Sequence, residues 1–352
     1  MTPTRRRLFF ATGAGMLAAL VGCSGDKSQG GATTPAPGTA PPPASPAPSP
    51  APPPPAVGGL HYATMAAASL GVGAPLNGAV PFPADNAWNQ DISAAPVDPN
   101  SANLIASIGL STGLHPDFGV IYGIPYVVVA GSQALVPVSF TAYADESDPG
   151  PYPIPPNAPI EGGGDRHVLV VDRDHNRLYE LFGAVAQSDG SWSAACGAVF
   201  RLDSDDVRPA AQPGWTSADA AGLPIFPGLA RYDEASAGLI PHALRFTVQS
   251  TRRAYLPPAT HWASSSTDAN LPPMGMRVRL KAGFAIPAGF STEARAILQA
   301  LKTYGMMVAD NGSNWYITGA PDPRWDNDTL NSELGSVQGS DFEVVQMEGL
   351  VS

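Results

Sequence analysis

Proline residues are spread along most of this 352-residue chain, and they limit the length of any helix that it can form. Of its 39 prolines, 12 lie between Pro35 and Pro55 and 26 follow residue 58. A proline inside a helix removes a backbone hydrogen bond and costs about 3 kcal/mol. The distribution therefore argues against helical bundles and coiled coils, and it sets one proline-rich segment apart from the rest of the chain.

The first 22 residues have the features of an export signal. Three arginines, Arg5 to Arg7, precede an apolar stretch from Leu8 to Val21. This stretch is shorter than the roughly 20 apolar residues that a membrane-spanning helix needs. The sequence therefore predicts a signal peptide over residues 1–22.

Two motifs in this leader resemble those of bacterial export signals. Leu20-Val21-Gly22-Cys23 resembles the lipobox of bacterial lipoproteins, and Thr4-Arg5-Arg6-Arg7-Leu8-Phe9 resembles the twin-arginine motif with Phe and Leu in reversed order. The lipobox resemblance implies cleavage before Cys23 and attachment of membrane lipid to its thiol. It also implies an exported protein that is anchored to a bacterial membrane in the cell envelope. An ordinary export signal without lipidation is the alternative.

Residues 23–59 predict a disordered tether that starts at the lipidated cysteine. They are mostly Pro, Ala, Ser, Gly and Thr, and they offer almost no apolar side chains to bury. Extended as polyproline II at about 3.1 Å per residue, residues 33–55 would reach roughly 70 Å. Residues 60–352 then form a single globular domain.

Short apolar runs separated by Gly, Pro, Asn and Asp dominate the domain and predict strands. The runs are 119–129, 134–142, 167–172, 177–182, 193–202, 242–248, 275–282, 306–309 and 314–318. Helices are few, with one expected at 101–108 and another at 292–304 that Ser291 caps and Gly305 ends.

Turn residues predict how some of these strands are connected. A polar loop between 168–171 and 178–181 indicates a hairpin, and Asp310-Asn311-Gly312-Ser313 indicates a second one. Together these patterns predict a mainly β domain, a β-sandwich or jelly roll with two or three short helices. A distorted β-barrel is the alternative.

Charge and missing motifs exclude several classes of function. The chain has 19 basic and 30 acidic residues, which argues against nucleic acid as a partner because phosphate binding needs a positive surface. Motifs of zincin proteases, P-loop enzymes and dinucleotide oxidoreductases are absent from the sequence. Cys196 is the only cysteine besides Cys23, so we expect it to be a small buried residue. No cofactor or metal is identified.

His242, Asp233, His167 and Asp165 are the candidate catalytic residues. His167 and Asp165 follow three glycines that give the backbone freedom to approach a ligand, and His242 begins a predicted strand near Asp233. A histidine beside a carboxylate can act as a general base. The alternative is a structural Asp-Arg pair with a partly buried histidine at Asp165 to His167, and a core histidine at His242. On a strand, His242 and Arg245 would point to opposite faces.

Other polar and aromatic residues are candidates for ligand binding, because Asn, Arg and Trp hydrogen-bond to sugar hydroxyls and stack on sugar rings. They are Arg231, Arg245, His261, Trp262, Asn314, Trp315, Arg324 and Trp325. The same residue types also occur in turns and cores of any β protein. The acidic run at Asp145, Glu146 and Asp148 suits either Ca²⁺ or a solvated loop.

These patterns predict a cell-envelope lipoprotein whose domain acts on an extracellular polysaccharide, as a glycoside hydrolase or lyase. A non-catalytic carbohydrate-binding lipoprotein or a structural envelope lipoprotein is the alternative, so the sequence leaves open whether the protein is an enzyme. Segments such as HALRFTV at 242–248 resemble exported bacterial proteins of unassigned function. That resemblance assigns no catalytic residue.

Overall fold

The computed structural model describes residues 59–210 and 213–352 of the chain. The predicted signal peptide, Cys23 and the tether up to residue 58 lie outside these residues. Within the described part, no helix is both long enough and apolar enough to cross a membrane.

Strands predominate in the described residues, and every α-helix is short. The α-helices are α1 (Ser101–Ile108), α2 (Tyr232–Ser236), α3 (Thr292–Thr303) and α4 (Asn327–Gly335), and the 3-10 helices are η1 (Ala144–Glu146), η2 (Phe226–Gly228) and η3 (Gly339–Asp341). The predicted mainly β fold with few short helices is confirmed.

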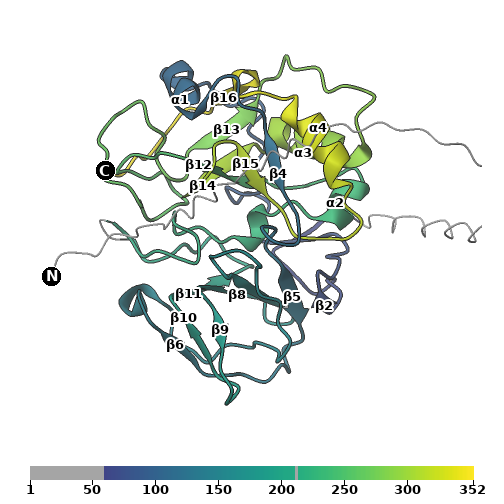
Figure 1. Cartoon of the computed structure of the whole chain (residues 1–352), viewed down its shortest axis with the longest axis vertical. Coiled ribbons are helices and arrows are strands. Elements are labelled where there is room, and N and C mark those ends of the chain that lie inside the picture. The colour runs from purple at the N-terminus through teal and green to yellow at the C-terminus, as the bar shows by residue number, and fades with distance from the viewer. Residues whose placement is uncertain (1–58, 211–212) are drawn as a thin grey trace, which may run out of the picture. The chain divides into compact units, whose positions relative to one another are not determined.

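The largest sheet has six strands and carries most of the helices. Its order is β16 (Phe342–Val344), β13 (Arg277–Leu280), β14 (Met306–Asn311), β12 (Leu244–Val248), β15 (Tyr316–Thr318) and β4 (His115–Asp117). Pairs β12–β14 and β15–β4 are parallel, and the other neighbours are antiparallel. Helix α1 packs beside β16, α3 beside β13 and α4 beside β4 (Figure 1).

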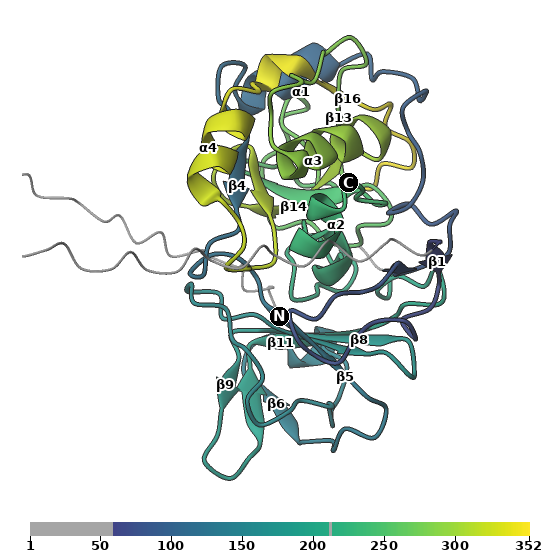
Figure 2. The ribbon, with the colours of Figure 1, turned by 90° about the vertical axis from the view of Figure 1, so that its right-hand side faces the viewer.

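A second sheet has five strands, in the order β11 (Cys196–Arg201), β8 (Arg177–Phe182), β7 (Val168–Asp172), β5 (Tyr126–Val129) and β2 (Gly71–Val72). Figure 2 shows its strands below the six-stranded sheet. Strands β7 and β8 pair as the hairpin that their polar loop predicts. Two small sheets complete the domain: β6 (Val138–Phe140), β10 (Trp192–Ala194) and β9 (Val185–Ala186), and the pair β1 (His61–Tyr62) and β3 (Ala79–Val80).

The second predicted hairpin is wrong. Strands β14 and β15 flank the Asn311-Gly312 turn, but β12 lies between them in the sheet. It pairs parallel to β14 and antiparallel to β15, and Gly312 N donates to Val248 O of this inserted strand. Strand β12, which comes about 60 residues earlier in the chain, therefore occupies the position beside β14 that β15 would take in a hairpin.

Helix α3 forms where its sequence predicts it. Ser291 Oγ accepts a hydrogen bond from Ala294 N and so caps the first turn. Gly305 follows the helix with a φ of 68°, a left-handed conformation that glycine adopts without steric cost. Ile297, Leu298 and other apolar residues of α3 are buried against the sheet.

One hydrophobic core extends across both large sheets. It includes Phe246 and Ile317 from the six-stranded sheet together with Leu169, Val171 and Leu178 from the five-stranded sheet. Charged side chains between the two sheets are therefore removed from water, and their partners must come from within the fold. A smaller core contains side chains of β5, β7 and β8 from the five-stranded sheet together with side chains of β10, and residues of β6 pack against it.

Candidate active site

Helix α2 and the residue before it gather several charged side chains next to the start of β12. Arg231 has an extended backbone, and Asp233 and Glu234 follow in the first turn of α2. Acidic side chains are favoured there because the first turn of a helix has N–H groups without helical partners. Ala230, which precedes Arg231, forms a bridge with Gly319 just after β15. This bridge to the six-stranded sheet thus holds the backbone in place directly before Arg231 and α2.

Glu234 is held by two side chains that are almost completely buried. Its Oε1 accepts a hydrogen bond of 2.8 Å from Arg231 Nη2, and its Oε2 lies 3.2 Å from His242 Nε2. The side chains of Arg231 and His242 are both 1% exposed, whereas that of Glu234 is 12% exposed. Burial opposes the charged form, but Arg231 and His242 together outweigh it and lower the pKa of Glu234. Glu234 is therefore an ionised carboxylate.

Asp233 has the opposite electrostatic environment. Its Oδ2 accepts a hydrogen bond of 3.0 Å from Leu76 N, while burial and the negative charge of Glu234 raise its pKa. Arg231 acts in the other direction but does not outweigh these effects. Of the two neighbouring carboxyl groups, Asp233 is the one that takes up a proton more readily.

His242 contacts its neighbours through both ring nitrogens. Nδ1 lies 2.8 Å from Ala243 O, which can only accept, so Nδ1 carries a proton. Nε2 lies 2.7 Å from Arg231 Nη2 and 3.2 Å from Glu234 Oε2. A guanidinium only donates and an ionised carboxylate only accepts, so the shorter contact requires a lone pair on Nε2 whereas the longer one requires a proton there. The geometry suits a residue that positions Arg231 and Glu234.

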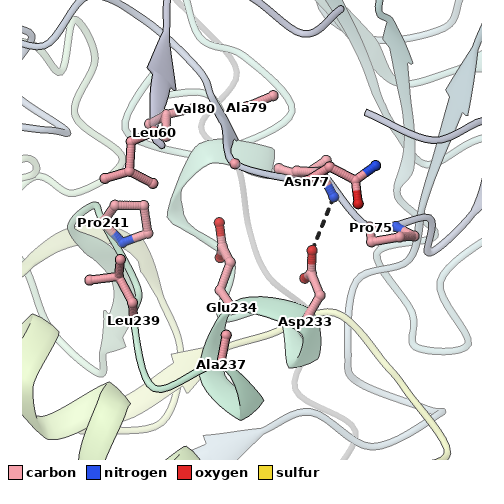
Figure 3. Close-up of a pocket in the computed structure, with 12 residues that line it drawn as sticks. Leu60, Pro75, Asn77, Ala79, Val80, Asp233, Glu234, Ala237, Leu239 and Pro241 are labelled. Atoms are coloured by element: carbon pink, nitrogen blue, oxygen red, sulfur yellow. Dashed lines mark hydrogen bonds between the residues drawn. The ribbon is translucent and has the colours of Figure 1, made fainter. Parts of the chain in front are cut away.

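A small pocket opens beside the two carboxylates. It encloses about 80 Å³ and is partly open to solvent. Figure 3 shows Asp233 and Glu234 extending toward the same space, with Leu60, Leu239 and Pro241 forming an apolar wall near Glu234. Sites for whole small ligands usually enclose about 300–1,000 Å³. This pocket therefore suits one group of a larger ligand that lies across its mouth.

The structure separates the other predicted catalytic residues from this pocket. His167 is buried at the start of β7, where its Nδ1 lies 2.6 Å from Glu161 Oε2. Asp165 is half-buried in the loop just before it. Arg245 is also buried, and its Nε donates to Asp219 Oδ2 at 3.3 Å. The strand predicted to begin at His242 begins at Leu244, so the expected alternation of His242 and Arg245 along one strand does not apply.

Both predicted sugar-stacking tryptophans are core residues. Trp315 is 0% exposed, stacks on Phe246 and Phe342, and donates from Nε1 to Gly109 O. Trp325 is 5% exposed and donates to Ala320 O. Neither forms an open aromatic surface, because each ring fills space between packed elements.

The remaining ligand-binding candidates lie at separate places. Asn314 accepts a hydrogen bond from Gln249 N, and His261 Nδ1 donates to Ala220 O. Trp262 is half-buried against Tyr255. Arg324 pairs with Asp322 and lies 4.3 Å from the ring of Tyr232, next to the pocket helix α2. Among the ligand-binding candidates, Arg231 binds Glu234, and both Arg324 and Trp325 contact Tyr232 of α2.

The acidic run and the lone thiol both have structural partners. Asp148 accepts hydrogen bonds from Val199 N and from Arg208, and Glu146 accepts one from Thr216 N. Cys196 is buried and its thiol donates to Ser217 O. Among the described residues, no group of three or more His, Cys, Asp or Glu side chains could hold a metal ion.

Comparisons with known proteins give no relative for this chain. No family model, no curated protein and no solved structure matches it. Inference about its function therefore rests on the chemistry of its own residues.

Sequence reasoning missed several of the residues that matter most here. Glu234 is not among the residues that the sequence predicts for the site, although it lies three residues after Arg231 and pairs with it. Glu161, Glu180 and Asp219 were not recognised either. For Glu180 the signal is its place between Tyr179 and Leu181, because a charged residue inside an apolar strand needs a specific partner.

Proposed function

We propose that the domain hydrolyses glycosidic bonds in an extracellular polysaccharide, with Glu234 as the ionised carboxylate and Asp233 as the acid. The observation that carries this proposal is that the two carboxyl groups face one pocket while their surroundings shift their pKa values in opposite directions. Glycoside hydrolysis needs this division, since one carboxyl group protonates the leaving oxygen and the other acts as nucleophile or base.

The pocket residues favour hydrolysis over the lyase reaction. A lyase needs a base whose lone pair reaches the substrate, together with a cation for the uronate carboxylate. Nε2 of His242 is occupied by its contacts with Arg231 and Glu234, and Arg231 is itself paired with Glu234. These two residues support the hydrolase instead, because they keep Glu234 charged and fix its orientation.

A purely carbohydrate-binding role has less support. Such modules present aromatic rings on an accessible surface. Trp315 and Trp325 are buried, and Arg324 is paired with Asp322. The described candidates therefore supply carboxylate chemistry rather than an aromatic platform.

Attachment to a membrane through Cys23 is part of the proposal, and it rests on the leader alone. The tether would place the domain tens of Å from that membrane, within reach of an envelope or extracellular polysaccharide. An acidic domain has little attraction to anionic lipid, so the attached lipid would supply the anchoring.

Incubation with a panel of polysaccharides tests the activity. Hydrolysis is expected to release reducing ends without the absorbance of an unsaturated product, whereas a lyase would produce that absorbance. Glu234→Gln and Asp233→Asn should each lower the rate at least about 100-fold on natural glycosides. Asp328→Asn is a matched control, since Asp328 also lies in the first turn of a helix but is exposed.

Substrates with an activated leaving group separate the two roles. A good leaving group needs no proton, so Asp233→Asn should recover most of its activity on a nitrophenyl glycoside while Glu234→Gln should not. Thermal unfolding of each variant verifies that it is folded. Equal loss in both variants on both substrates, or full activity of folded Glu234→Gln, would contradict the proposal.

A further inference from the structure

Ionisable side chains form a buried group between the two large sheets, separate from the pocket. We call Glu161, His167, Glu180, Asp219 and Arg245 the inter-sheet cluster. All five are less than 9% exposed, and Glu180 and Asp219 are 0% exposed. Glu180 lies on β8 of the five-stranded sheet, and Arg245 lies on β12 of the six-stranded sheet. Asp219 is in the segment that connects them.

The hydrogen bonds of His167 require an additional proton. Its Nε2 lies 3.2 Å from Ala218 O, which can only accept, so this nitrogen carries a proton. Its Nδ1 lies 2.6 Å from Glu161 Oε2, and a hydrogen bond there needs a second proton on either the imidazole or the carboxyl group. The pair therefore holds one proton more than a neutral histidine beside an ionised glutamate.

These contacts connect the two sheets in series. His167, at the start of β7, binds Ala218 O, and the next residue, Asp219, binds Arg245 on β12. Arg245 Nη1 also donates to Thr318 Oγ1 on β15 at 2.7 Å. If the His167–Glu161 pair loses this proton, His167 can keep only one of its hydrogen bonds to Glu161 and Ala218 O. The contact between β7 and the segment that contains Ala218 and Asp219 would then weaken.

Negative charge exceeds positive charge around this connection. His167 faces Glu161 and Asp165 from the loop before β7, Glu180 from β8, and Asp219 and Arg245 from across the interface. Asp310 of β14 adds a further negative charge near Asp219. In the described part of the chain, Asp219 Oδ1 is buried and accepts no hydrogen bond. An ionised oxygen in that position is costly, and a proton relieves the cost.

We propose that the inter-sheet cluster is a proton-binding site that tightens the contact between the two large sheets as the pH falls. Uptake of protons neutralises its excess negative charge and completes the hydrogen bonds of His167. The domain is thereby adapted to an acidic medium, whatever substrate its pocket takes.

The electrostatic environment of the cluster gives the direction of this effect. Burial raises the pKa of Glu180 to about 7 and also raises that of Asp219 despite its contact with Arg245. Burial opposes the charged form of His167, but Glu161 outweighs it and raises the pKa. A group with a raised pKa binds protons more tightly in the folded than in the unfolded chain. Its stabilisation is complete at low pH and is lost as the pH rises through the folded value.

Unfolding of the full chain by urea between pH 5.5 and 8.5 tests this site. The wild-type unfolding constant is expected to rise with pH, and Glu180→Gln should reduce that rise by about tenfold or more, since each unit of pKa difference corresponds to a factor of ten. Glu348→Gln, an exposed position, is the matched control and should keep the wild-type dependence. Equal pH dependence in both variants would overturn the proposal.

Spectroscopy of the wild-type chain tests it without any substitution. In a long-range proton–nitrogen spectrum, His167, assigned through its contact with Phe182, should show a proton at Nε2 and a shared or full proton at Nδ1 at pH 6. That second proton should be lost at higher pH. An Nδ1 that stays an unprotonated, hydrogen-bond-free nitrogen at pH 5.5 would overturn the proposal, even if Glu180→Gln failed to fold.

Discussion

Arg231 Nη2 donates to His242 Nε2 over 2.7 Å, and both side chains are buried behind the Glu234 carboxylate. Arg231 also donates from Nη1 to Phe226 O at 3.0 Å, so one guanidinium connects η2, α2 and the start of β12. Five planar donors can satisfy several acceptors at once, which a lysine could not do. Removing either partner would leave the other with a buried polar group and no replacement.

Replacing His242 with Ala is expected to destabilise the domain more than it alters the chemistry. The change leaves Arg231 Nη2 without one acceptor and opens a cavity, so we expect a loss of about 2–4 kcal/mol in the free energy of unfolding. Urea unfolding measures this loss. Activity per folded molecule should fall less than in Glu234→Gln. Unchanged stability with at least about a 100-fold loss of activity would instead make His242 an acid–base group.

The pH dependence of hydrolysis should be bell-shaped, with its optimum on the acidic side. Glu234 must be ionised, and its pKa lies below the usual 4.5, so activity falls only when the pH drops through that lowered value. Asp233 must be protonated, and its pKa lies above the usual 3.8, so activity falls as the pH rises through that raised value. In Asp233→Asn, the alkaline limb should disappear for substrates with an activated leaving group. Initial rates across the pH range give both limbs.

Asp148 is expected to be essential for stability although it lies in a surface acidic run. It pairs with Arg208, whose side chain is 3% exposed and which also donates to Thr216 O and Glu146 O. Asp148→Ala leaves this arginine without its carboxylate, so we expect a loss of about 2–4 kcal/mol in unfolding free energy. The neighbouring Asp145 is exposed, and Asp145→Ala should unfold like the wild type. Similar losses in both variants would mean that the pair with Arg208 is not the cause.

Local signals predicted the parts of the fold that depend on neighbouring residues. The loop between β7 and β8 forms its hairpin, and Ser291 caps α3. The insertion of β12 between β14 and β15 has no such signal, because it depends on a strand about 60 residues earlier in the chain. Helix α2 was missed because five mostly polar residues are too few to show helical periodicity.

Proximity in the sequence also explains which part of the site was predictable. Asp233 and His242 are nine positions apart and were predicted to lie near each other, and the structure places both of them, with Arg231, around Glu234 and its pocket. His167 and Arg245 each have a partner that was not foreseen, Glu161 and Asp219 respectively. The apolar pattern of a strand can predict that a charged side chain within it is buried. It cannot predict which residue of another segment will supply the opposite charge.

Lipidation at Cys23 predicts a specific change in location. In Cys23→Ala the thiol that would take the lipid is absent, so the protein should be released from membranes or remain as an unprocessed precursor. Membrane fractionation and the mass of the mature N-terminus measure this. A wild-type chain that is soluble and cleaved away from Cys23 would disprove the anchoring.

Gly319→Ala is expected to disturb both the fold and the site. A Cβ at this position would lie 2.3 Å from Phe118 Cδ1, and that ring is buried and packed against Trp325, so it has little room to move. Overpacking of this kind costs about 1–3 kcal/mol. Because Gly319 bridges Ala230, the strain reaches the residue that precedes Arg231, so activity should fall by more than the loss of folded protein explains.

The control for this prediction is Gly164→Ala, where an added Cβ meets no atom within 4 Å. This substitution should leave activity unchanged and can raise stability by about 0.4–1 kcal/mol, because alanine restricts the unfolded chain. Thermal unfolding and initial rates of the two variants give the comparison. If Gly319→Ala loses stability but keeps its full rate per folded molecule, the bridge between β15 and Ala230 does not position Arg231, and the ion pair with Glu234 is held by α2 alone.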